Sequence, residues 1–312
     1  MKDCTMAPLR GIFLKLCAVM CFIVMFAMIK ASAEHVPPGE TVFFRSFFSM
    51  PVIFGWLAYR GDLGVGLKVI SPTAHVLRGC LGTVAMGTNF AAVGLLPLPE
   101  VTALGYAMPL LVVVFAAMFL HEKVGPFRFG AVALGLVGVI VVMEPNLTLQ
   151  SGDQVRTTQA IGVVLVLFGA TCGALSQVHI RNMVQVEQTS AIVFWFSMTS
   201  CALALMTIPF GWVMPTGLEW VWLVSSGLIG GVGQICLTSS YRFADASLVA
   251  PFDYASMIFA VLIGYAFFDE VPTLQTLIGA ALVISAGVII ILRERHLGLQ
   301  RGRARQAKTP MG

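Results

Sequence analysis

Ten long apolar segments constrain this chain more than any other feature of its sequence. Each approaches the roughly 20 consecutive apolar residues that an α-helix needs to cross the hydrocarbon core of a bilayer. The segments are continuously apolar and do not alternate, which excludes a transmembrane β-barrel. Charged residues make up only 11% of the chain, against about a quarter in a soluble domain. We therefore predict an all-α membrane protein whose ten transmembrane helices span residues 10–31, 40–59, 74–96, 99–120, 127–143, 158–179, 189–210, 218–241, 246–267 and 274–292.

The N-terminal segment has a second interpretation. Lys2 and Arg10, an apolar run and then Ala31-Ser32-Ala33 resemble a cleavable signal peptide. However, the apolar stretch of residues 11–29 is longer than the 7–15 residues of a signal-peptide core. We therefore interpret this segment as the first membrane helix.

The distribution of Lys and Arg predicts the orientation. These residues collect in the loops on the cytoplasmic side of a membrane. With a cytoplasmic N-terminus and ten alternating helices, all but three of the 19 Lys and Arg residues flank the cytoplasmic side, Lys15 and Arg78 among them. The exceptions are Lys30, Arg45 and Arg156. We therefore predict that both termini are cytoplasmic, and that the net charge of +4 reflects topology rather than a nucleic-acid partner.

An internal repeat relates the two halves of the chain. The segment Val76–Pro145 reads again at Leu223–Glu294, about 148 residues later, and Tyr106 then corresponds to Tyr254. A unit of five helices has an odd number of crossings, so its second copy must insert in the opposite orientation. Inverted repeats around a site near the membrane midplane are the architecture of alternating-access transporters. The other interpretation is a duplicated scaffold that transports nothing.

The repeat also predicts the domain boundaries. We expect the first five-helix repeat in residues 1–147 and the second in residues 158–293, followed by a basic cytoplasmic tail in residues 294–312. No connecting loop is long enough to form a further domain.

Short motifs in both halves resemble those of a known family. They are Phe43-Phe44-Arg45, the stretch Glu100–Pro109 with His121-Glu122-Lys123, and Ala244-Asp245-Ala246 with Asp269-Glu270. In order and spacing they resemble the drug/metabolite transporter superfamily, EamA type, over residues 10–293. The resemblance implies a ten-helix carrier of the inner membrane with a central cavity between its halves. Such families transport amino acids, S-adenosylmethionine or riboflavin, so the fold alone does not name the substrate.

Asp253 is the sharpest candidate for the substrate site. It lies about seven residues inside a predicted span, beside Pro251 and Tyr254, and an ionisable group at that depth is a functional candidate by default. It could bind a cationic group of the substrate or carry a proton. The alternative is a structural ion pair with a basic residue.

Three other charged residues lie near the ends of predicted spans. Arg45 either extends to the outer surface, pairs with Glu40 or binds an anionic group. We interpret Lys30 as an anchor at the membrane interface. Glu100 follows Pro99 at the start of a helix, where a carboxylate suits the positive end of the helix dipole.

Uncharged polar residues complete the predicted site. Asn89 and Gln234 lie well inside their spans, where a polar group should face the interior of the bundle. Tyr106 and Tyr254 correspond in the two halves, which would place them on either side of a pseudo-twofold axis. We predict a substrate-binding cavity near Asn89, Tyr106, Gln234, Asp253 and Tyr254, with Arg45 as a further candidate.

Other functional classes lack their motifs. His121-Glu122 is followed by Gly125 where a zinc protease needs a second histidine, and neither a Gly-x-Ser-x-Gly elbow nor a phosphate-binding loop occurs. We therefore expect no enzyme activity, no metal, no cofactor and a carrier driven by a gradient. The expected partners are a small solute and the lipid bilayer; nucleic acid is not expected, and a homodimer is left open.

The aromatic residues favour riboflavin uptake as the first substrate prediction. A flat and largely uncharged ring system would stack on aromatic side chains. The residues near the predicted cavity are Phe43, Phe44, Phe47, Phe48, Tyr106, Phe252 and Tyr254. The alternatives are an amino acid exporter, in which Asp253 and Arg45 would bind an ammonium and a carboxylate, and an S-adenosylmethionine carrier.

Overall fold

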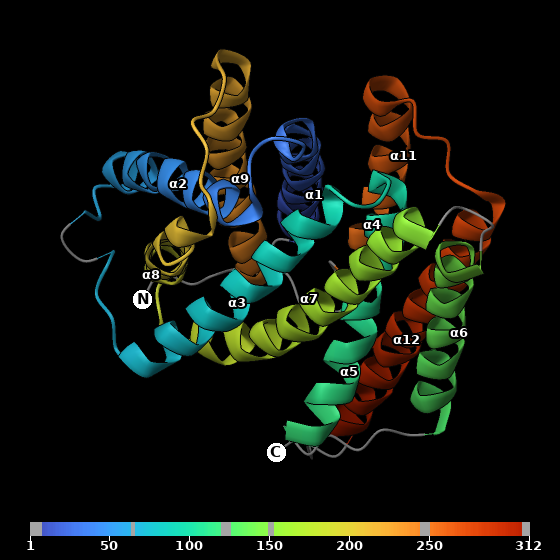
Figure 1. Ribbon diagram of the computed structural model, residues 1–312. Helices are drawn as coiled ribbons and strands as arrows, with labels where there is room; N and C mark the ends of the chain where they lie inside the picture. Colours follow the sequence, from blue (N-terminus) through green and yellow to red (C-terminus); the bar gives the residue numbers. More distant parts are fainter. Residues whose placement is uncertain (1–7, 64–65, 120–125, 149–152, 244–249, 308–312) are drawn as a thin grey trace.

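The computed structural model describes residues 8–63, 66–119, 126–148, 153–243 and 250–307, and every regular element in these residues is a helix (Figure 1). The first half contains α1 (Pro8–Ser32), α2 (Pro38–Arg60), α3 (Pro72–Val93), α4 (Leu98–Gly105), α5 (Ala107–Phe119) and α6 (Pro126–Thr148). The second half contains α7 (Asp153–Val186), α8 (Thr189–Leu205), η1 (Ile208–Phe210), α9 (Gly217–Phe243), η2 (Ala250–Tyr254), α11 (Ala255–Phe268) and α12 (Leu274–Ala307).

Proline and glycine set several helix ends. The helices α2 and α3 begin at Pro38 and Pro72, where proline fits because the first backbone N–H groups of a helix have no intrahelical acceptor. Helix α2 ends at Arg60 and is followed by Gly61, whose φ of 70° is a left-handed conformation that glycine adopts without steric cost. Local sequence thus decides where these helices begin and end.

Five helices among the described residues are long and apolar enough to cross a membrane by length and composition. They are Leu9–Ser32, Pro38–Arg60, Pro72–Val93, Thr157–Val184 and Gly217–Ser240. Shorter apolar helices contribute the other crossings; α4 with α5, and η2 with α11, each form one broken span.

The two broken spans break at corresponding residues. Helix α4 ends at Gly105 and α5 begins at Ala107, while η2 ends at Tyr254 and α11 begins one residue later. In the first half Pro109 has no N–H to donate to the carbonyl of Gly105, so the helix cannot continue regularly through this point. Broken helices free backbone polar groups, and transporters use them around their substrate sites.

Helix packing relates the two halves by a pseudo-twofold axis. Helix α3 lies along α7, and the corresponding pair α9 and α1 is also in contact (Figure 1). Helix α2 packs on its counterpart α8, and α6 packs on its counterpart α12. The last pair lies so close together that a Cβ atom at Gly138 would come within 2.8 Å of the carbonyl oxygen of Gly279.

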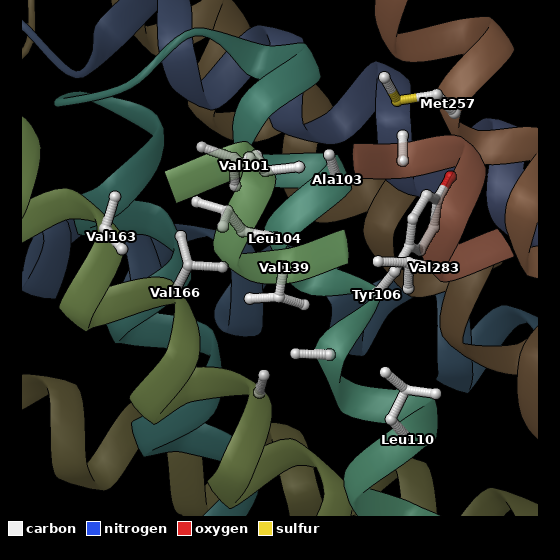
Figure 2. Close-up of a cluster of buried hydrophobic side chains, with 14 of the residues drawn as sticks. Val101, Ala103, Leu104, Tyr106, Leu110, Val139, Val163, Val166, Met257 and Val283 are labelled. Atoms are coloured by element: carbon white, nitrogen blue, oxygen red, sulfur yellow. The ribbon is translucent and has the colours of Figure 1, made fainter. Parts of the chain in front are cut away.

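The largest cluster of buried apolar side chains lies where the broken spans meet (Figure 2). Figure 2 shows Tyr106 among the apolar side chains that include Leu104, Met257 and Val283. The rings of Tyr106 and Tyr254 meet edge to face at 5.1 Å between centroids. The Tyr106 hydroxyl donates to the carbonyl of Tyr254 (3.2 Å) and lies 2.8 Å from the hydroxyl of Ser256. This cluster holds the two halves together beside the cavities described next.

Candidate functional site

Two cavities adjoin each other inside the bundle. The aspartate cavity, about 260 Å³, is lined by Asp253, Tyr106 and Ser256 among others. The arginine cavity, about 230 Å³, is lined by Arg45 and Arg78 among others. The two cavities share the wall residues Phe22, Phe26, Asn89 and Met108. A single elongated ligand could therefore contact both cavities.

The structure brings five of the six predicted site residues to these cavities. Asn89 lines both cavities, Tyr106 and Asp253 line the aspartate cavity, and Arg45 and Gln234 line the arginine cavity. Tyr254 lines neither cavity. It packs against Tyr106, and a Cβ atom at Gly287 would overlap its hydroxyl group, so its position is one of close packing.

Asp253 forms an ion pair with Lys15. The Lys15 Nζ lies 2.7 Å from Asp253 Oδ1, and the lysine side chain is only 1% exposed whereas the aspartate is 35% exposed. Lys15 comes from α1 and Asp253 from η2, so the pair joins the two halves. The carboxylate keeps an accessible side towards the cavity while the lysine is enclosed.

Lys15 was missed as a site residue by the sequence reasoning, which counted it among the cytoplasmic flanks. Its position several residues inside α1 was the available signal, because a buried lysine must have a charged or polar partner. The pairing itself follows from the packing of α1 against η2.

Arg45 and Arg78 are both buried, with 2% and 5% of their surface exposed. Their guanidinium carbons lie 5.6 Å and 4.0 Å from the centroid of the same ring, that of Phe196. In both residues Nε and Nη1 are buried without a hydrogen-bond partner. The two residues therefore bring donors without acceptors to one cavity.

The environment of Arg45 differs from two of its three predicted roles. It does not extend to the surface, because it is almost fully buried. It does not pair with Glu40, whose Oε2 instead accepts a hydrogen bond from the backbone N–H of Val213 (3.0 Å). The remaining alternative, a site for an anionic group, is the one that the cavity suits. Arg78 was missed because it was counted as a flanking charge at the start of its span.

Lys30 forms a polar cluster rather than a simple interfacial anchor. Its Nζ lies 2.8 Å from Glu270 Oε1 and donates to the carbonyls of Val93 (3.1 Å) and Leu96 (2.8 Å). Glu270 Oε2 accepts from the backbone N–H of Leu98 (2.8 Å). The cluster ties the end of α1 to the α3–α4 connection and to the residues after α11. Glu122, which corresponds to Glu270, lies outside the described residues together with His121 and Lys123.

Glu100 lies in the first turn of α4 and is 7% exposed. This position at the positive end of a helix agrees with the expected role in stabilising the helix start. Glu100 lines neither of the two cavities.

Together these features define the class of protein: a multi-pass helical membrane protein with charged cavities between two corresponding halves. The chain belongs to the EamA-like transporter family, which it matches over residues 9–144 and 160–293. The match to both halves confirms the predicted resemblance and the predicted fold class of ten transmembrane helices in two five-helix repeats.

The chain is also similar to individual transporters. It is 28% identical to the pseudopaline exporter CntI of Pseudomonas aeruginosa over 284 residues, 90% of this chain and 95% of that protein. It is 25% identical to the S-adenosylmethionine uptake transporter of Rickettsia felis over 86% of this chain and 87% of that protein. A solved crystal structure superposes with a TM-score of 0.66, covering 92% of this chain and 98% of that chain at 22% identity, which supports the fold alone. The relatives are transporters of metabolites, and a metabolite transporter is what the family supports for this chain.

Proposed function

We propose that the protein is a secondary carrier that moves an amino-acid-like metabolite across the inner membrane by alternating access. The observation that supports this function is the pair of adjoining cavities, one with an accessible carboxylate and the other with two cations. A molecule with an ammonium and a carboxylate group would place each beside the opposite charge. Asn89 lies in the shared wall, where its amide can hydrogen-bond the middle of the ligand.

In this proposal the Asp253–Lys15 pair is the switch between empty and occupied states. Lys15 neutralises the aspartate when the cavity holds no ligand, because a carboxylate in an apolar interior needs a counterion. A substrate ammonium would share or replace that contact at the accessible side of the carboxylate. The Lys30–Glu270 cluster would close one end of the bundle and open during the transport cycle.

The carrier is proposed to keep both termini in the cytoplasm, since the cytoplasmic loops of the predicted topology hold most of the Lys and Arg residues. The Lys30–Glu270 cluster then lies at the outer end of the bundle. Either an importer or an exporter fits this arrangement, as the named relatives include one of each.

Riboflavin, the first substrate prediction from the sequence, is no longer our leading candidate. The phenylalanines that suggested it pack on one another and on tryptophans: Phe43 contacts Trp212, and Phe44 contacts Trp220. Neither they nor Phe252 line the two cavities. A largely uncharged ring system would also leave both buried arginines without an acceptor. Riboflavin uptake stays a prediction, to be tested beside the amino-acid-like substrates.

Counterflow in proteoliposomes tests the proposal. Purified full-length protein would be reconstituted with an unlabelled solute inside, and uptake of the same labelled solute would be measured for amino acids of each charge class, S-adenosylmethionine and riboflavin. We expect counterflow for a solute with amino and carboxyl groups and none for riboflavin. Counterflow of riboflavin alone would reverse this ranking, and a protein that moves none of these solutes in correctly sealed vesicles would contradict the proposal.

A further inference from the structure

Two like charges share the arginine cavity. Arg45 comes from α2 and Arg78 from α3, and both guanidinium groups lie over the ring of Phe196 on α8. Since both distances are measured to one ring, the two cations lie within about 10 Å of each other, where like charges repel strongly in an apolar interior. The aromatic face offsets only part of this cost, because two like charges share a single ring.

Among the described residues, none of those that line the arginine cavity carries a carboxylate, and carboxylates elsewhere in the two halves have other partners. Glu40 accepts from the backbone N–H of Val213, and Asp253 pairs with Lys15. Nε and Nη1 of Arg45 and of Arg78 remain buried without acceptors. A buried charge without a counterion is costly and is retained in proteins mainly where a ligand or partner supplies the opposite charge.

Glycines on two helices make room for the guanidinium groups. A Cβ atom at Gly82, one turn along α3 from Arg78, would overlap Nη1 of that arginine. A Cβ atom at Gly230 on α9 would come within 3.1 Å of Nε of Arg45. The space around both cations is therefore built into the backbone, which positions their donors at the cavity.

We propose that Arg45 and Arg78 bind two carboxylate groups of the substrate, so that the substrate is an amino acid with at least one additional carboxylate. This inference rests on the proposed function and narrows its substrate class. The charges around the two cavities support this substrate class. Lys15 and Asp253 neutralise each other, so Arg45 and Arg78 leave the joined cavities with two positive charges. A substrate with one ammonium and two carboxylates would neutralise them more fully than a neutral amino acid. Arginine suits this task, because its planar fork donates two parallel hydrogen bonds to a carboxylate.

Ligand-induced thermal stabilisation tests the inference. The purified full-length protein would be titrated with L-aspartate and L-glutamate, and with their matched amides L-asparagine and L-glutamine. Each amide keeps the shape of its acid and removes one negative charge. We expect at least one acid to raise the melting temperature well above the effect of its amide. Equal shifts for acids and amides, or no shift with any acid, would overturn the inference.

Variants separate a ligand site from a structural role. Arg78→Gln should weaken binding of the effective acid by about 30-fold or more, because truncating one partner of a buried charge pair costs about 2–5 kcal/mol. Without ligand the same variant should melt at the same or a higher temperature, since it removes an unpaired buried cation. Gly82→Ala should weaken binding through displacement of the arginine. Arg60→Gln is the matched control, because Arg60 is half-exposed and pairs with Asp62 at 3.3 Å.

Failure of this inference is distinguishable from failure of the proposed function. Counterflow of neutral amino acids that persists in the Arg45→Gln/Arg78→Gln double variant would overturn the two-carboxylate site and leave the carrier intact. Binding of an acid that depends on both arginines, without counterflow of any solute, would support the anion site and contradict the carrier. If the double variant does not fold without ligand, Arg78→Gln alone replaces it. Acid binding and counterflow are then measured in the same way and are interpreted in the same way.

Discussion

The two halves of the molecule share their packing but not the charges of their cavities. Residues that correspond across the repeat meet directly: the hydroxyls of Ser49 and Ser197, 148 residues apart, lie 2.8 Å from each other, and Tyr106 meets Tyr254 at the same separation in sequence. Contacts of a residue with its own counterpart are expected where a pseudo-twofold axis passes. All four of these side chains are uncharged.

Carboxylates at the start of the second helix of each half form matching links. In the first half Glu40, near the start of α2, accepts from the backbone N–H of Val213 before α9. In the second half Glu187, just before α8, accepts from the backbone N–H groups of Ile70 (2.9 Å) and Ser71 (2.8 Å) before α3. Each half therefore ties its second helix to the connection that precedes the third helix of the other half.

The charged residues at the cavities, unlike these links, are not repeated in the two halves. Positions that correspond to Lys15, Arg45 and Arg78 in the second half hold valine, valine and serine, at residues 163, 193 and 226. The position that corresponds to Asp253 in the first half is a glycine, residue 105. The first half thus supplies the cations and the second half supplies the carboxylate. Duplication explains the scaffold, while the substrate chemistry depends on residues that differ between the copies.

The largest expected effect concerns the orientation of the two halves, which cysteine labelling from each side of the membrane tests. In a background without the native cysteines, Gly152→Cys should react with a membrane-impermeant maleimide added outside the cell, and Arg242→Cys should react only after the membrane is opened. The reason is that an odd number of crossings separates the two positions. External labelling of Arg242→Cys without labelling of Gly152→Cys would contradict the inverted repeat.

Asp253→Asn should abolish transport while membrane abundance stays near that of the wild type. The substitution keeps the shape of the side chain and removes the charge that a substrate ammonium would contact. Lys15→Gln/Asp253→Asn is the matched control, because it removes both members of the pair and leaves no unpaired buried cation. If the double variant regains transport, the aspartate serves only to neutralise the lysine and the proposed site role is wrong.

Lys30→Met should reduce transport by about tenfold and expose one end of the cavity, since removal of one partner of a buried charge pair costs a few kcal/mol. The readout is the labelling rate of a cysteine introduced at Val101, which lines the aspartate cavity. We expect faster labelling from the outside in Lys30→Met than in the same background with Lys30 intact. Arg60→Gln, which removes an exposed ion pair outside this cluster, should change neither the transport rate nor the labelling rate. Unchanged labelling with unchanged transport would show that the Lys30–Glu270 cluster is not a gate.

Glu40→Ala and Glu187→Ala should each destabilise the protein by about 2 kcal/mol, because each leaves partly buried backbone donors without an acceptor. Thermal unfolding in one detergent, with Arg60→Gln in an exposed ion pair as the control, measures the difference. Clearly unequal losses of unfolding free energy would show that the two links, although similar in geometry, do not contribute equally to stability.

The Glu187 link also predicts a pH dependence. Burial raises the pKa of this carboxyl, but hydrogen bonds from the backbone of Ser71 and Ile70, together with nearby His75, outweigh burial and lower it below its usual value. A carboxyl whose folded-state pKa is lowered contributes stability above its unfolded pKa and loses it as the pH falls through the folded value. The wild type should therefore lose more stability than Glu187→Gln on acidification below the unfolded pKa of a glutamate. An identical pH profile in both proteins would contradict this link.

The helical spans and the repeat could be predicted because both depend on properties that run along the chain. Apolar length decides whether a helix can cross a bilayer, whatever its neighbours are. The repeat is visible in residues such as Tyr106 and Tyr254, and an odd helix count makes the inversion follow. That Asp253, Asn89 and Gln234 face the interior of the bundle could be predicted for a similar reason, since a polar residue deep inside a span must face away from lipid.

Only the tertiary structure decided how the charges combine. Lys15 and Arg78 lie near the ends of their spans, where the same sequence position can face a headgroup or the interior, depending on helix tilt and on the helix packed beside it. The packing of α1 against η2 encloses Lys15 beside Asp253, and the packing of α3 against α8 brings Arg78 to Phe196. Packing likewise turned the phenylalanines of α2 towards tryptophans and away from the cavities. Sequence determines which groups the membrane can hold, but the direction that each one faces is set by contacts between helices far apart in the chain.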